Sequence, residues 1–153
     1  MKKRPTETTV VELPIDEIRP HPKNPKKHFD EGIESSIKDK GYIELMVVDE
    51  DNQLIAGEGR WRALKKLGYE KVKVVRKIGF TEKQKLEYLL ASNKLVERGG
   101  WDEEILRTIE RDTLLVGAFD KEELDGIFRP ETKEDDFDAD VEYASITKAD
   151  SAR

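Results

Sequence analysis

Glycines and arginines alternate closely in residues 56–63, which read AGEGRWRA. Glycine adopts positive φ readily and lets backbone N–H groups approach a ligand without a Cβ in the way. A helix that begins at these glycines would present unpaired N–H donors and the positive end of its dipole to an anion. Arginine adds a guanidinium group that binds two phosphate oxygens at once. The pattern therefore predicts phosphate binding. The predicted ligands are Gly57, Gly59, Arg60 and Arg62.

Glu58 lies between the two glycines, where its carboxylate would repel a phosphate. Three roles would account for it: holding an arginine in place, binding a metal ion, or acting as a catalytic base. The alternative for the whole segment is a tight strand-to-helix turn with solvated arginines. A local glycine pattern does not separate that turn from a phosphate site.

A proline-rich basic loop at residues 19–28 contains further polar candidates. Its two histidines, His21 and His28, have no third nitrogen or sulfur ligand beside them. Zinc needs several such ligands, so surface-loop histidines are expected rather than a metal site. The lysines of this loop, among them Lys26, suit either a nucleic-acid backbone or simple solvation.

The elements that must position these groups follow from hydrophobic periodicity and from turn residues. Strands are expected at 8–13, 45–49, 53–56 and 71–76. Helices are expected at 30–40 and 60–67, and after Thr81, Asp102 and Asp120. Asp30, Asp102 and Asp120 are the expected caps, and Thr81 with Gln84 has the pattern of a capping box. Strands come first and helices follow, so the fold class is α+β (mixed α/β).

Three parts are expected along the chain. Residues 8–80 form an α+β domain, and residues 81–128 form a helical extension packed on it. Residues 129–153 are rich in acidic groups and poor in apolar ones, which predicts a disordered tail or linker. Trp61 and Trp101 occur at helical spacing with apolar partners, so both are expected in the core, with stacking on nucleic-acid bases as the alternative.

Bulk composition excludes several classes of protein. The chain has 153 residues, 41% of them charged, a net charge of −6 and no cysteine. Disulfides, thiol catalysis and cysteine-bound zinc are therefore ruled out. No apolar run is long enough to cross a membrane, and no secretory signal begins the chain. A cytoplasmic protein is expected, with oligomerisation left open.

Several spaced segments together resemble the ParB/sulfiredoxin superfamily. Residues 56–63 resemble its GERRxRA box, and residues 24–29 (NPKKHF) resemble its NPRxxF box. The resemblance covers about residues 10–128 and implies a small mixed sheet with packed helices. In that family the NPRxxF box closes over a nucleotide. The resemblance therefore adds Asn24 and Lys26 to the predicted ligands, with ATP or CTP and Mg²⁺ as the implied ligand and cofactor.

The sequence also departs from the family pattern. Gly59 stands where the first arginine of the box is usual. The family's ENxxR box, whose acid and amide hold magnesium, reads SNKL at residues 92–95, so Asn93 alone is left as the implied metal ligand. The absence of cysteine excludes sulfiredoxin activity. These departures favour binding over hydrolysis.

A narrower resemblance is to a phage and mobile-element branch of the superfamily. Residues 91–95 (ASNKL) and 101–106 (WDEEIL) are similar to a pattern of proteins in which this domain precedes a DNA methyltransferase. Residues 135–141 and 146–150 resemble the junction to the methylase. Methyltransferase catalytic motifs are themselves absent from this chain.

Three functions follow as hypotheses. The first is a module that binds a nucleotide or DNA and serves a DNA-modification or partition system. The second is a metal-dependent nuclease or nucleotide hydrolase or kinase, in which Glu58 is catalytic and Asn93 binds the metal. The third is a protein-interaction adaptor.

Overall fold

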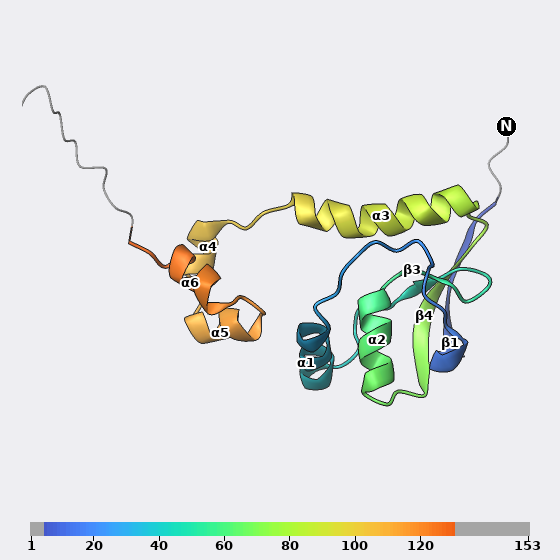
Figure 1. Cartoon of the computed structure of the whole chain (residues 1–153), viewed down its shortest axis with the longest axis horizontal. Coiled ribbons are helices and arrows are strands. Elements are labelled where there is room, and N and C mark those ends of the chain that lie inside the picture. Colours follow the sequence, from blue (N-terminus) through green and yellow to red (C-terminus); the bar gives the residue numbers. More distant parts are fainter. Residues whose placement is uncertain (1–4, 131–153) are drawn as a thin grey trace, which may run out of the picture. The chain divides into compact units, whose positions relative to one another are not determined.

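A four-stranded mixed sheet organises the first part of the chain. The computed structural model describes residues 5–130, and the chain divides into two compact units, residues 1–101 and 102–153. The strands are β1 (Glu7–Pro14), β2 (Val47–Val48), β3 (Leu54–Ala56) and β4 (Lys71–Ile78), in the order β1-β4-β2-β3. β4 pairs antiparallel with β1 and parallel with β2, and β2 pairs antiparallel with β3 (Figure 1). The predicted fold class is confirmed.

Strand β4 lies between β1 and β2 and anchors the core. Its buried Val72 and Val74 alternate with exposed lysines, as expected of a strand with one covered face. β2 and β3 are shorter than predicted, and their register shifts between Val47 and Val48. The core of this unit joins strand, loop and helix residues. Its buried members are Leu13, Ile15, Ile18, Ile37, Met46, Val48, Leu54, Ala63, Leu64, Val72 and Val74.

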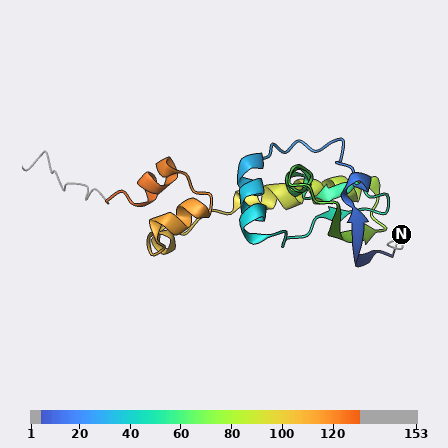
Figure 2. The same ribbon diagram turned by 90° about the horizontal axis from the view of Figure 1, so that it is seen from below.

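Three helices belong to this unit: α1 (Asp30–Lys40), α2 (Glu58–Lys66) and α3 (Glu82–Arg98). α1 packs beside α2, and α3 contacts β3 (Figure 1). Figure 2 shows the segment between the first 3-10 turn, Ile15–Glu17, and α1 as an extended loop. The capping box of α3 is confirmed, since both of its hydrogen bonds are formed.

Two details of the helix starts were predicted wrongly. Asp30 is the first residue of α1 rather than its cap, and its carboxylate binds Arg62 instead of the helix end. α2 begins at Glu58, earlier than the predicted start at Arg60, because Gly57 turns the chain directly into the helix.

The second unit, of which residues 102–130 are described, contains α4 (Glu103–Arg107), α5 (Arg111–Val116) and α6 (Lys121–Ile127). The predicted caps Asp102 and Asp120 are confirmed, whereas α5 was not foreseen. These helices share a small core of their own. Its buried members are Leu106, Leu114, Leu124 and Ile127.

Helix α3 lies in the first unit, and α4 to α6 lie in the second. The three-part division at residues 80 and 128 stays a prediction, and the acidic tail from residue 131 lies outside the described residues. Trp61 packs against the core as expected, but Trp101 is 72% exposed, so its predicted burial was wrong. Among residues 5–130, no helix has the length and apolar character that a membrane span requires.

Candidate functional site

Helix α2 begins directly after Gly57, whose φ of 98° lies in the left-handed region that favours glycine. No side chain caps this end, so the first N–H groups of α2 are not satisfied by an N-cap residue. A Cβ built on Gly57 would lie 2.8 Å from Met46 Cγ and 2.9 Å from Arg60 Nη2. The guanidinium of Arg60 therefore lies directly against the glycine at the helix N-terminus.

The guanidinium of Arg60 has hydrogen-bond donors that its neighbours do not all use. Its Nη1 donates to Glu44 Oε2 at 3.0 Å, and the side chain of Glu44 is 88% exposed. Its Nε is buried and has no hydrogen-bond partner within residues 5–130. An unpaired buried donor on a charged group is costly unless a further acceptor meets it. The arginine therefore combines a positive charge with an unused donor at the start of α2.

Glu58 makes contacts that the sequence did not indicate. Its Oε2 accepts a hydrogen bond from Asn24 Nδ2 at 2.6 Å and lies 3.1 Å from His28 Nε2. Of the three roles considered for Glu58, that of holding an arginine is not the one seen within residues 5–130, because Arg60 binds Glu44 and Arg62 binds Asp30 instead. The structure thus brings the predicted residues Asn24 and Glu58 together.

Gly59 is buried in the first turn of α2. A Cβ at this position would lie 2.7 Å from Ile33 Cδ1 and 3.0 Å from His28 Nδ1. Its lack of a side chain allows α1 and the 19–28 loop to approach α2 closely. This need for space was not anticipated, and a backbone contact of Gly59 with phosphate stays a prediction.

The two histidines of the 19–28 loop are more buried than is usual for side chains of a surface loop. The side chain of His28 is 11% exposed, and His21 is buried with its Nδ1 accepting from the Lys23 N–H. The surface-loop expectation was therefore wrong for both residues. The pattern of the loop gave no local signal of the partners that cover them.

The other two predicted cationic ligands have carboxylate partners. Arg62 Nη2 lies 2.9 Å from Asp30 Oδ2, on the side of α2 that faces α1. Lys26 Nζ lies 2.6 Å from Glu97 Oε1 on α3. Hydrogen bonds from Lys26 and then from Lys94 lower the pKa of Glu97. A phosphate at either cation would have to compete with an existing ion pair.

Asn93, the implied metal ligand, lies on α3. Its Nδ2 donates to the Leu89 carbonyl at 2.9 Å, and Ser92 Oγ donates to the same oxygen at 3.0 Å. Ser92 supplies no carboxylate, so the amide oxygen of Asn93 is the magnesium-type ligand offered by this pair. Its role as a metal ligand stays a prediction.

A buried ionic cluster around Lys85 was missed by the sequence analysis. Lys85 and Asp49 are each 2% exposed, and Lys85 Nζ lies 2.9 Å from Asp49 Oδ2. It also lies 3.0 Å from both Glu50 Oε1 and Glu82 Oε1. Burial opposes the charge of Lys85, but these hydrogen bonds outweigh it and raise its pKa. The burial of Lys85 could have been predicted from its spacing, since it lies one helical turn before the buried Leu89 on the same face of α3.

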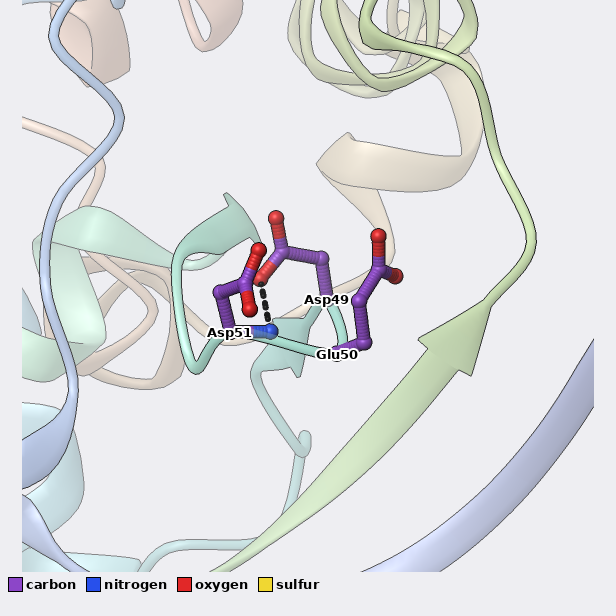
Figure 3. A group of neighbouring side chains, drawn as sticks. All are labelled: Asp49, Glu50 and Asp51. Carbon is purple, nitrogen blue, oxygen red and sulfur yellow. Dashed lines mark hydrogen bonds between the residues drawn. The ribbon is translucent and has the colours of Figure 1, made fainter.

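The acidic turn after β2 has the ligand types of a metal site. Oxygens of Asp49, Glu50 and Asp51 lie within 4.8 Å of one another (Figure 3). Lys85 already supplies a cation to the first two. Asp49 Oδ1 also accepts from the N–H groups of Asp51 and Gln53, each at 2.9 Å. The carboxylates of Asp49 and Glu50 therefore hold the turn and fasten α3 to it.

Residues 1–94 match the model of a family described as the ParB N-terminal domain. A probable chromosome-partitioning protein ParB from Rickettsia typhi is 33% identical over 94 residues, 58% of this chain and 32% of the relative. Its counterpart from Chlamydia muridarum is 42% identical over 89 residues, 50% of this chain and 32% of the relative. The chain therefore spans about a third of the length of these relatives.

A solved structure shares the fold. It is the C-terminally truncated chromosome-partitioning protein ParB from Caulobacter crescentus, complexed with CTP-γ-S. The similarity has a TM-score of 0.53 at 23% identity and covers 78% of this chain and 70% of that one.

Proposed function

This chain belongs to the ParB N-terminal domain family, and from that premise we propose that it is a module that binds phosphates at the N-terminus of α2. A nucleotide is the first candidate ligand, and a DNA backbone is the alternative. The chromosome-partitioning relatives and the neighbour complexed with CTP-γ-S support this choice of ligand. CTP is therefore the first nucleotide to test, and ATP is the second.

One observation carries the proposal: the Arg60 guanidinium lies on Gly57, and its buried Nε has no hydrogen-bond partner within the described part of the chain. A phosphate at this point would accept from the Arg60 guanidinium and from the first N–H groups of α2. It would also be favoured by the positive end of the helix dipole. Charge, unused donors and a close backbone approach therefore coincide at one place.

The 19–28 loop lies beside this place and would frame the ligand. Asn24 is bound to Glu58 on the first turn of α2, and Lys26 is bound to Glu97 on α3. The loop is thereby fastened to both helices. Mg²⁺, which binds phosphate oxygens and retains several waters, would arrive with the nucleotide.

Arg60→Ala is expected to abolish nucleotide binding, because it removes both the positive charge and the Nε donor. The measurement is the melting temperature with CTP, ATP or duplex DNA at low salt, each with Mg²⁺ and with EDTA. A ligand at one hundred times its Kd should stabilise the wild type by about 2.7 kcal/mol. Arg62→Ala should weaken binding less than Arg60→Ala, because Arg62 is already held by Asp30.

Arg111→Ala is the matched control for the arginine variants. Arg111 lies in the second unit and, like Arg62, forms a solvent-exposed ion pair with an aspartate, Asp125. Its loss should leave ligand binding unchanged. If neither nucleotides nor DNA raise the melting temperature of the wild type, the binding proposal fails and the adaptor hypothesis stands.

A hydrolytic function is the second candidate, and the His28–Glu58 contact is the observation that favours it. A carboxylate held by histidine beside a phosphate site resembles the arrangement of a catalytic base. The serine at position 92, where the family has an acid, counts against it. We expect no phosphate release from CTP or ATP with Mg²⁺, measured against a blank without protein. Release that Glu58→Ala abolishes would establish the enzyme instead.

The biological setting is proposed at two levels. Two relatives of this chain are named probable chromosome-partitioning proteins, and this supports a role in DNA partition. Service to a DNA methyltransferase of a phage or mobile element is the narrower proposal. It rests on the sequence resemblance of residues 91–95 and 101–106. A methylase encoded after residue 153 would support it.

A further inference from the structure

The proposed phosphate site contains a carboxylate that needs a physical explanation. Glu58 is the acidic residue in the first turn of α2, next to Gly57. An ionised carboxylate there is favoured by the helix dipole but repels a bound phosphate. Because neither arginine of the segment binds Glu58, its charge must be offset by other groups.

Two donors from the 19–28 loop meet one oxygen of this carboxylate. Asn24 Nδ2 and His28 Nε2 lie 2.6 and 3.1 Å from Glu58 Oε2. An ionised carboxylate can only accept, so Nε2 of His28 must be the protonated nitrogen. The side chains of His28 and Glu58 are 11% and 18% exposed, so water competes little for this contact.

Gly59 makes this arrangement sterically feasible. His28 Nδ1 and Ile33 Cδ1 occupy the space that a side chain at position 59 would need, at 3.0 and 2.7 Å from a built Cβ. A larger residue at position 59 would push both side chains away. The His28 imidazole can therefore occupy this position only because residue 59 has no side chain.

We propose that His28 is a positioning residue of the phosphate site. Together with Asn24 it offsets the charge of Glu58 and fixes the 19–28 loop against α2, in the space that Gly59 leaves open. This inference rests on the proposed function. It adds that Glu58 is tolerated beside a phosphate because His28 holds it.

The test is a double-mutant cycle on the dissociation constant for CTP, measured by isothermal titration calorimetry. His28→Ala is expected to weaken binding about tenfold, because it removes a hydrogen bond to a charged group. In a Glu58→Ala background neither the charge nor the acceptor remains, so adding His28→Ala should change Kd by less than about twofold. His28→Gln, which keeps an N–H donor at similar reach, should restore affinity to within about threefold of the wild type.

His21→Ala is the matched control, since His21 is a buried histidine of the same loop that binds the Lys23 N–H and not Glu58. Any loss it causes should be the same in the wild-type and Glu58→Ala backgrounds. A loss from His28→Ala that persists in the Glu58→Ala background, or no loss at all, overturns the inference. If Arg60→Ala still abolishes CTP binding in that case, the proposed function survives. If the wild type binds neither a nucleotide nor duplex DNA, both fall together.

Discussion

Lys85→Met is expected to lower the free energy of unfolding of the first unit by about 3 kcal/mol, because it leaves a buried carboxylate without its counter-ion. Lys85 and Asp49 are each 2% exposed, and their charged atoms lie 2.9 Å apart. Breaking a buried ion pair usually costs about 3–5 kcal/mol. We expect the lower end of this range, because Glu50 and Glu82 in the same cluster reach solvent. Urea denaturation followed by circular dichroism measures the change.

A second substitution tests the reason for that loss. Lys85→Met combined with Asp49→Asn removes both charges, while the amide oxygen can still accept from the Asp51 and Gln53 N–H groups. The double variant should therefore be more stable than Lys85→Met alone. Lys83→Met is the control on the same helix, and its exposed contact with Glu87 should cost less than about 0.5 kcal/mol. Equal losses at positions 83 and 85 would contradict this account.

The pH dependence of the Lys85 contribution follows from its raised pKa. A group whose pKa is higher in the folded than in the unfolded chain adds stability that is fully present below the unfolded value. That stability is lost as the pH rises through the folded value. The difference between wild type and Lys85→Met should therefore stay constant near neutral pH. It should shrink only above about pH 10, where unfolded lysine loses its proton.

Gly57→Ala is expected to destabilise the first unit by about 2 kcal/mol and to abolish phosphate binding. The φ of 98° strains any residue with a Cβ. The added Cβ would also lie 2.8 Å from Met46, which is fully buried, and 2.9 Å from the Arg60 guanidinium. The change therefore moves the arginine on which binding is proposed to depend. Urea denaturation and titration calorimetry with CTP measure the two effects.

Gly68→Ala separates backbone strain from the clash. Gly68 also has a positive φ, 84°, but nothing lies within 4 Å of its built Cβ. It should cost about 1 kcal/mol of stability and leave CTP binding unchanged. If Gly57→Ala binds CTP as tightly as Gly68→Ala does, the close approach at Gly57 has no part in the site.

Local sequence signals predicted the start of a helix well where the capping hydrogen bonds form within one helical turn. The capping box of Thr81 and Gln84 and the caps Asp102 and Asp120 formed as expected. Gly41 ended α1. The predicted cap at Asp30 was wrong because a distant contact determines its position: its carboxylate binds Arg62 on another helix.

The candidate site was only partly predictable. The glycines and Arg60 were identified because a strand, a glycine and a helix adjoin in the sequence, and that order alone places donors at a helix end. The roles of Gly59 and His28 were not identified. Both depend on how closely α1 and the 19–28 loop approach α2.

By itself, the sequence determined several helix ends and the approximate strand positions, and it predicted where a phosphate would bind, because caps and glycine turns act within a few residues. Only the tertiary structure decided which partner each charged side chain takes. Glu58 binds Asn24, 34 residues earlier, and Lys85 binds Glu50, 35 residues earlier. A charged group pairs with whichever opposite charge or donor the fold brings within about 3 Å. No local pattern records that choice, because it depends on the packing of elements distant in the chain.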